Sequence, residues 1–106
     1  MDIGFHAPDM AGFGATNVLA ALQVGATSVE GSIGGIGGGV LLPPHALQVG
    51  NRATEDLVYL LNCGGVVAGI ETLAVLGASQ VSARLLSMKP RGRPTSCGPP
   101  GEFTLC

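Results

Sequence analysis

The sequence predicts an α/β fold, because strand-like and helix-like segments alternate along a chain of 106 residues. Strands are expected at residues 2–6 and 27–33, and helices at residues 14–24, 54–63 and 70–86. A glycine-rich loop, about residues 34–51, separates the second strand from the second helix. The length allows one small domain.

The first helix is expected to carry one apolar stripe and to stop at a glycine. Val18, Leu19 and Leu22 fall on one side of a helix. Gly25 follows the last turn, and glycine often ends a helix because it adopts a left-handed conformation without strain. The segment is therefore predicted to be an amphipathic helix ending near Gly25.

The second strand is predicted from alternation. Val29 and Ile33 face one way, whereas Glu30 and Ser32 face the other, which is typical of a strand with one polar face. The loop that follows opens with glycines, whose backbone reaches positive φ and allows a ligand to approach closely. A loop of this length is more often functional than decorative.

The second helix is expected to begin at Thr54 as its N-cap and to end before two glycines that follow Cys63. Glu55 and Asp56 fall in its first turn, where the helix dipole favours negative charge. In the third helix, Gly77 costs roughly 1 kcal/mol relative to alanine. The residues expected to share its apolar face are Ile70, Leu73, Ala74, Val81 and Leu85.

Composition argues against nucleic-acid and membrane partners. The net charge is −2 and the isoelectric point about 5.5, so no basic face is expected. No apolar run approaches the ~20 residues that span a bilayer. No signal or transit peptide is visible, which favours a cytoplasmic location, or a mitochondrial one if a preceding segment carries a transit peptide.

The domain is expected to cover residues 1–87, followed by a disordered tail at residues 88–106. From Met88 onward the composition shifts to Pro, Gly, Arg, Ser and Thr. The cysteines form no C-x-x-C pair, and their odd number favours a reducing compartment. Cys63 is expected to be a small buried hydrophobe, and the sequence assigns no role to Cys97 and Cys106.

Taken alone, the polar residues and the glycine loop do not identify a functional site. The glycine loop lacks both the Lys-Ser/Thr of a Walker loop and the G-x-G-x-x-G spacing of a dinucleotide-binding turn. His6 at a strand end, three residues before Asp9, fits a surface or hydrogen-bonded histidine as well as a ligand. Asn51 before a helix fits a turn residue, because asparagine tolerates left-handed geometry.

Three segments in order resemble one family. Residues 5–17 resemble the motif H-x-H-D-x-x-G-x-x-x-A-N, and residues 31–39 resemble S-x-x-G-x-G-G-C. Residues 50–61, Gly-Asn-Arg-Ala-Thr-Glu-Asp-Leu-Val-Tyr-Leu-Leu, are very similar to the G-N-x-A-T-E-D-L-V-Y segment of hydroxymethylglutaryl-CoA lyases. The resemblance covers about residues 3–86, and the last segment is the most specific.

The resemblance implies a (β/α)₈ barrel, of which this chain would supply the C-terminal part: about the last two β/α units plus an extra helix. It implies retro-aldol cleavage of hydroxymethylglutaryl-CoA to acetyl-CoA and acetoacetate, an acyl-CoA substrate, and a divalent metal, Mg²⁺ or Mn²⁺. His6 matches the first metal histidine and Asn51 the metal asparagine. Asp9 matches the aspartate that follows the second histidine and supports the ligands. Gly37, Gly38 and Gly39 match the substrate loop.

Two positions depart from the family pattern. Pro8 stands where the second metal histidine is expected, and Gly39 where the loop cysteine is expected, so no catalytic side chain is assigned. Such barrels typically need ~250 residues, so the isolated chain is expected to be inactive. The alternatives are a non-catalytic remnant or interaction module, and a fragment of a sister aldolase or Claisen-type synthase. Unpaired strand edges are expected to favour self-association.

Overall fold

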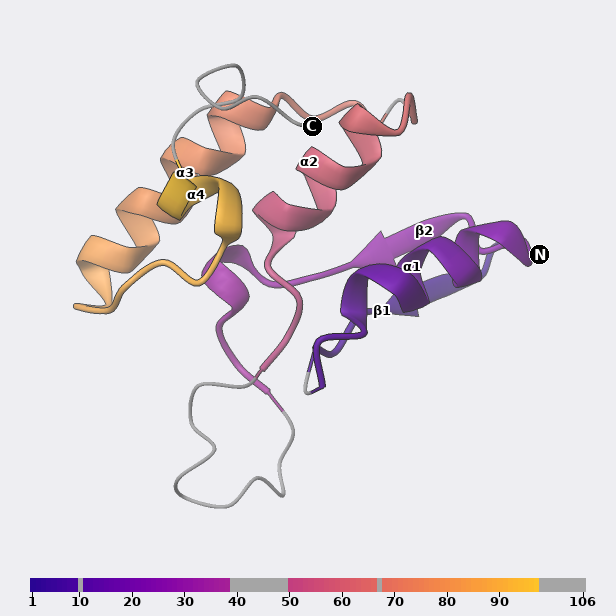
Figure 1. The fold of residues 1–106 in the computed structure, drawn as a ribbon, viewed down its shortest axis with the longest axis horizontal. Coiled ribbons are helices and arrows are strands. Elements are labelled where there is room, and N and C mark those ends of the chain that lie inside the picture. The colour runs from indigo at the N-terminus through magenta and orange to yellow at the C-terminus, as the bar shows by residue number, and fades with distance from the viewer. Residues whose placement is uncertain (10, 39–49, 67, 98–106) are drawn as a thin grey trace.

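The computed structural model describes residues 1–9, 11–38, 50–66 and 68–97, and these form an α/β arrangement (Figure 1). Its elements, in chain order, are β1 (Gly4–His6), α1 (Gly14–Gln23), β2 (Ser28–Glu30), the 3₁₀ turn η1 (Ile33–Gly35), α2 (Thr54–Cys63), α3 (Thr72–Leu85) and α4 (Arg93–Cys97). The predicted order of strand, helix, strand, loop, helix, helix is therefore observed, with one additional short helix.

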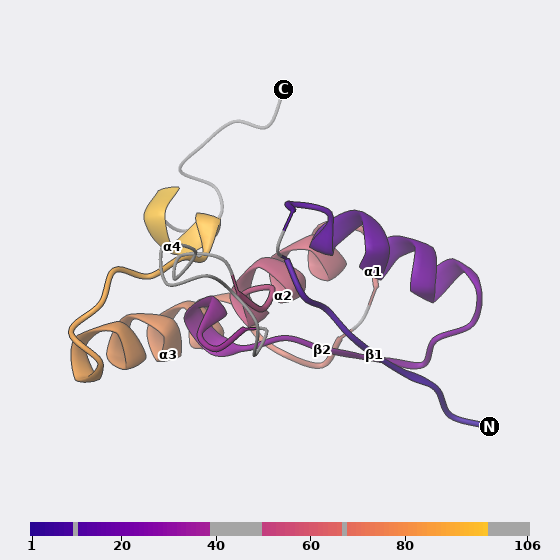
Figure 2. The same ribbon diagram turned by 90° about the horizontal axis from the view of Figure 1, so that it is seen from below.

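The two strands form an open parallel sheet, and α1 makes the crossover between them. Phe5 pairs with Val29, and His6 pairs with Glu30 at the carboxyl ends of both strands. Figure 2 shows β1 and β2 side by side, with α1 lying over one face of the pair. Beyond the strands, single bridges join Pro8 to Asn51 and Ser32 to Ala53. The segment that precedes α2 is thereby held at the carboxyl end of both strands.

The core beneath α1 is small. Ala7, Val18 and Leu57 are buried together, and Leu22 and Val29 pack against them while remaining partly exposed. Two members of the predicted stripe of α1 therefore face the core. The third, Leu19, is 45% exposed, so that part of the prediction is wrong.

The start of α2 differs from its prediction. The N-cap residue is Ala53, which has an extended conformation, and Thr54 is the first helical residue. No side chain makes a capping hydrogen bond at this end of the helix. Glu55 and Asp56 do lie in the first turn, but they are 0% and 8% exposed rather than on a solvated face. Carboxylates buried this deeply require specific partners, because desolvation of a charge is costly.

α3 turns a different face inward from the one its apolar pattern predicts. Its buried residues are Val75, Leu76, Ser79 and Ala83. The predicted apolar face is exposed, with Leu73 at 66% and Leu85 at 80%. The physical reason is that the Ser79 hydroxyl donates to the buried Glu55 carboxylate, and this polar contact sets the rotation of α3.

The predicted disordered tail also differs from the structure over part of its length. Residues 93–97 form α4, which lies beside α2 and α3, and the Arg93 amide donates to Asp56. Residues 98–106, with Cys106, lie outside the described residues.

Cys63 and Cys97 are exposed, so the prediction of a buried Cys63 is wrong. Cys63 ends α2 next to the turn at Gly64, away from the core.

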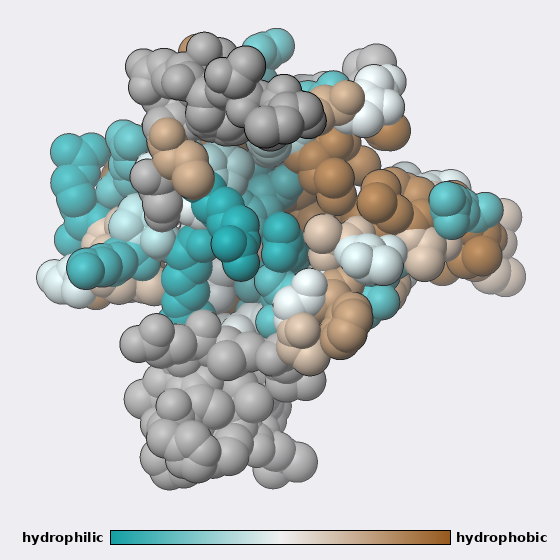
Figure 3. Space-filling model, in the orientation of Figure 1, coloured by the Kyte–Doolittle hydropathy of each residue, from teal (hydrophilic) through white to brown (hydrophobic). Residues whose placement is uncertain are grey.

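Apolar surface remains uncovered on one side of the described structure. In Figure 3, hydrophobic residues gather over α1 and α2, whereas hydrophilic residues lie around α3 and α4. A groove of about 300 Å³ lies between β2 and α2, lined mainly by apolar side chains such as Leu57, Val58 and Ile70. None of the helices in the described ranges is long and apolar enough to cross a membrane.

Candidate functional site

His6 and Asn51 meet at the carboxyl end of β1, although 45 positions separate them in the chain. The Arg52 amide donates to the Ala7 carbonyl at 2.8 Å, and the Asp9 amide donates to the Gly50 carbonyl at 2.9 Å. These two backbone bonds place residues 50–52 antiparallel to residues 7–9. As a result, His6 Nε2 lies 3.1 Å from Asn51 Oδ1.

Asn51 is oriented by a hydrogen bond, and His6 has a carboxylate close by. The Asn51 amide nitrogen donates to the Ile36 carbonyl at 3.1 Å, which directs its oxygen toward His6. On the other side of the imidazole, Nδ1 lies 3.6 Å from the carboxylate of Glu30, the strand partner of His6. The Asn51 oxygen can only accept, so at 3.1 Å the His6 Nε2–H is the donor of this hydrogen bond. A divalent ion bound between the two atoms would take the place of that proton.

This geometry fits two neighbouring ligands of one cation. Two ligands at right angles, each about 2.1 Å from an ion, lie about 3 Å apart, close to the observed separation. Imidazole nitrogen and amide oxygen both bind divalent ions. Across the described ranges, however, no three His, Cys, Asp or Glu side chains converge on one point to hold a metal. The described residues therefore bring together two candidate ligands and not a complete set.

Pro8 and Asp9 contribute through the backbone and through an ion pair. Pro8 has no side-chain donor atom, and its backbone pairs with Asn51. Asp9 Oδ1 accepts from the Gly14 amide at the start of α1 at 2.9 Å, and its Oδ2 accepts from Arg52 Nη1 at 2.7 Å. Asp9 thus ties α1 to the residue after Asn51, as a supporting group would.

The glycine turn packs against Asn51. Gly34, Gly35 and Gly37 have φ of 63°, 68° and 77°, which side chains with a Cβ rarely adopt. A Cβ on Gly37 would lie 3.1 Å from Asn51 Nδ2, and one on Gly50 would collide with the Gly37 carbonyl. Glycine is therefore required where the turn meets residues 50–51. Of the predicted substrate loop, Gly37 and Gly38 are described, whereas Gly39 lies outside the described residues.

An acidic network behind this turn was not predicted as part of the site. Glu55 accepts from Ser79 Oγ at 2.6 Å and, through its other oxygen, from the Gly34 amide at 3.0 Å. It therefore connects α2 and α3 to the glycine turn. The Glu-Asp pair was visible in the sequence, but a first-turn carboxylate is ordinarily solvated, and no periodic pattern indicates its burial.

Arg52, just before α2, forms ion pairs with Asp9 and with Asp56. Its Nη2 lies 3.2 Å from Asp56 Oδ2, and its Nη1 contacts Asp9, while its Nε is buried without a hydrogen-bond partner. Burial raises the pKa of Asp56, although the Arg93 amide and the Arg52 guanidinium oppose this rise. The side chains beside Asn51 are therefore held by buried charge pairs.

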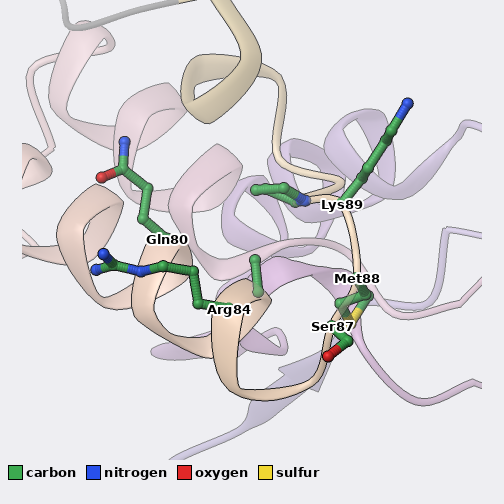
Figure 4. Close-up of a pocket in the computed structure, with 7 residues that line it drawn as sticks. Gln80, Arg84, Ser87, Met88 and Lys89 are labelled. Carbon is green, nitrogen blue, oxygen red and sulfur yellow. The ribbon is translucent and has the colours of Figure 1, made fainter.

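A second feature is an open pocket of about 550 Å³ at the C-terminal end of α3. Figure 4 shows Gln80 and Arg84 projecting from α3, and Ser87, Met88 and Lys89 on the segment that follows. Arg84 and Lys89 give the pocket positive charge, whereas its other lining residues are neutral. Such a pocket suits an anionic ligand with an apolar portion.

Ligands of open α/β sheets bind at the carboxyl ends of the strands, and His6, Asn51 and the glycine turn lie at this edge of the sheet. The chain belongs to the HMGL-like family, whose model matches residues 1–81. The matched residues include the strands, the glycine turn, α2 and most of α3.

Individual relatives in this family differ in activity. The chain is 36% identical over 91 residues to the 4-hydroxy-2-oxovalerate aldolase of Roseiflexus castenholzii, covering 85% of this chain and 24% of the relative. It is 38% identical over 88 residues to the mitochondrial hydroxymethylglutaryl-CoA lyase of Mus musculus, covering 82% of this chain and 26% of the relative. The chain thus spans about a quarter of the length of these curated relatives.

A solved structure shows the same partial coverage. An HMG-CoA lyase from Acinetobacter baumannii, in complex with coenzyme A and 3-methylmalate, superimposes with a TM-score of 0.81 at 31% identity. The match covers 97% of this chain and 33% of that one. The predicted fold class, a part of a (β/α)₈ barrel of the lyase family, is confirmed. The two parallel strands described here are an open portion of such a barrel.

Proposed function

We propose that this chain supplies part of the active site of a metal-dependent carbon–carbon lyase that cleaves hydroxymethylglutaryl-CoA to acetyl-CoA and acetoacetate. The observation that carries the proposal is the convergence of His6 Nε2 and Asn51 Oδ1 at 3.1 Å. Their orientation by Glu30 and by the Ile36 carbonyl supports it, since metal ligands are ordinarily held by such outer contacts.

In this proposal, His6 and Asn51 hold a divalent ion, Mg²⁺ or Mn²⁺, on one side. The bound ion would stabilise negative charge on a substrate oxygen. Glu30 orients the His6 ring, and the Asp9–Arg52 pair holds the backbone that carries Asn51. Gly37 and Gly38 allow the substrate to approach the backbone closely. Gly39 brings no thiol, so the loop cysteine of the family pattern has no counterpart at this position.

The acyl-CoA assignment draws support from the pocket at the end of α3. Coenzyme A carries several phosphate groups, and Arg84 and Lys89 bring two positive charges to that pocket. The structural neighbour described above holds coenzyme A, which makes a coenzyme A thioester the favoured substrate class. We propose that the pocket receives the phosphate-bearing end of the substrate.

A second candidate is an aldolase that acts on a 4-hydroxy-2-oxo acid. The 36% identity to the Roseiflexus aldolase favours it, whereas the segment Thr54–Tyr59 resembles the lyases. A small oxo acid has no phosphates, so an aldolase needs neither Arg84 nor Lys89. Loss of coenzyme A binding in Lys89→Glu would favour the lyase, and a chain that never binds coenzyme A would favour the aldolase.

The metal site is tested by titrating Mn²⁺ into the chain and its variants, followed by the paramagnetic resonance of the free ion. We expect weak binding, because two ligands of a near-octahedral ion come from the described residues. Both His6→Ala and Asn51→Ala should abolish it. Gln23→Ala removes an exposed side chain at the end of α1 and serves as the control. Equal binding by Asn51→Ala and wild type would contradict the proposed site.

A further inference from the structure

A short segment that follows the residues matched by the family model contacts the glycine turn of the candidate site. We call residues 91–95 the C-terminal strap; it follows the matched residues 1–81. Arg91 Nη1 donates to the Gly35 carbonyl at 3.2 Å, and the Arg93 amide donates to Asp56 Oδ1 at 2.8 Å. Between them, Gly92 is buried so closely against Glu55 that a Cβ there would collide with its carboxylate. The strap is thus fastened to the glycine turn and to the acidic pair of α2.

Arg91 reaches both backbone segments that position Asn51. The Gly35 carbonyl, its acceptor, immediately precedes Ile36, whose carbonyl accepts the Asn51 side-chain amide at 3.1 Å. A Cβ on Gly35 would lie 3.1 Å from the Asn51 carbonyl and 3.6 Å from Arg91 Cβ, so this glycine is sandwiched between the two residues. A Cβ on Gly50 would lie 3.2 Å from Arg91 Nη1. The guanidinium therefore lies where the glycine turn meets residues 50–51.

We propose that Arg91 is a positioning residue of this site: it holds the glycine turn so that the Asn51 amide oxygen faces His6. The inference rests on the proposed function only for its effect on metal binding, because the orientation of Asn51 is measurable without metal. The guanidinium donates to the Gly35 carbonyl while lying in the space beside Gly50 that a side chain there would need, and its donors have a fixed geometry. The ammonium of lysine is a single point charge without that planar geometry, so it should replace the guanidinium only in part.

The test compares wild type with Arg91→Ala and Arg91→Lys in the full chain. Nuclear magnetic resonance follows the Asn51 side-chain amide, whose hydrogen exchange should be at least tenfold slower than in a free asparagine when it is bonded to Ile36. Arg91→Ala should remove most of that protection and shift the His6 ring resonances, and Arg91→Lys should restore part of both. Wherever Mn²⁺ binds, Arg91→Ala should weaken it by roughly tenfold, the usual effect of losing an outer contact.

Arg93→Ala is the matched control. It removes the same charge from the same strap, but it keeps the backbone amide that donates to Asp56. The inference is overturned if Arg91→Ala leaves the Asn51 and His6 signals unchanged. It is also overturned if Arg93→Ala shifts them equally, or if Asn51 in wild type shows the shifts of an unfolded chain. If Mn²⁺ fails to bind wild type while Arg91→Ala still releases Asn51, the proposed metal function fails and the positioning role stands.

Discussion

Two adjacent carboxylates, Glu55 and Asp56, are almost wholly removed from solvent at 0% and 8% exposure. The two carboxylates replace their lost hydration with different partners. Glu55 accepts two hydrogen bonds from neutral donors, the Ser79 hydroxyl and the Gly34 amide. Asp56 is paired with Arg52 and also accepts from the Arg93 amide. These partners come from four separate segments, so the acidic pair links the parts of the chain around the candidate site.

Ser79→Ala should destabilise the fold through Glu55. The substitution leaves one buried carboxylate oxygen without its hydroxyl donor, which typically costs about 1–3 kcal/mol. The free energy of unfolding, measured by urea denaturation, should fall by that amount. Ser82→Ala, three residues along the same helix and less buried, should change it little. Equal losses in the two variants would show that Glu55 does not depend on Ser79.

The raised pKa of Asp56 predicts how the stability of the fold changes with pH. Burial raises its pKa in the folded chain above the unfolded value, so the folded state holds the proton more tightly. The contribution of this group to stability is therefore greatest at low pH and falls as pH rises through the folded pKa. Asp56→Asn should remove this decline, as measured by thermal unfolding between about pH 4 and pH 7. A decline of the same slope in Asp56→Asn would assign it to another group.

Among the elements, α3 shows how one polar contact overrides an apolar pattern. The helix has enough leucine and valine to bury either face. The Ser79–Glu55 contact selects the face with Val75 and Leu76, and it leaves Leu73 and Leu85 exposed. Exposed leucines in a stripe of this kind are available to contact another surface. Self-association through the open strand edges stays a prediction.

Paired leucine substitutions in α3 distinguish the observed face from the predicted one. Leu76 is 6% exposed, so Leu76→Ala should cost about 2–5 kcal/mol of unfolding free energy by leaving a cavity. Leu73 is 66% exposed, so Leu73→Ala should stay within about 0.5 kcal/mol of wild type. Circular dichroism during urea unfolding measures both. A larger loss of unfolding free energy in Leu73→Ala than in Leu76→Ala would show that the face predicted from the apolar pattern is the buried one.

At the scale of the whole molecule, the described residues form a parallel β-α-β unit, two further long helices and a strap. This assembly buries a small core and leaves an apolar groove between β2 and α2. A solved barrel of the family is about three times the length of the matched region. Enclosure of a substrate would then require other barrel segments, so we expect this chain alone to be inactive.

The purified chain should not cleave hydroxymethylglutaryl-CoA. Losing one positioned acid or base typically costs 10²–10⁴-fold, and Pro8 and Gly39 replace two functional side chains of the family pattern. The assay couples acetoacetate formation to a reporter enzyme in the presence of Mn²⁺ and a reducing agent. Product formation above a heat-treated control, and absent in His6→Ala, would contradict this expectation and show that a working site is present.

The sequence alone determined the local elements, because these depend on nearby residues. Alternation in residues 27–33 and glycines after residues 24 and 63 predicted β2 and the ends of α1 and α2 to within a few residues. His6 and Asn51 were singled out as a pair through resemblance to a family, since nothing local connects residues 45 positions apart. Their contact in the structure agrees with that pairing, and their role as ligands stays a prediction.

Tertiary structure alone decided the burial of Glu55, the inward face of α3 and the course of residues 88–97. Each depends on contacts between distant segments: Ser79 with Glu55, Arg91 with Gly35, and the Arg93 amide with Asp56. Periodicity shows which side chains are apolar, but it does not show which distant donor will bind a buried carboxylate. The free energy of desolvating a carboxylate exceeds that of exposing a leucine, so the acidic pair fixed the packing of the helices and the strap around it.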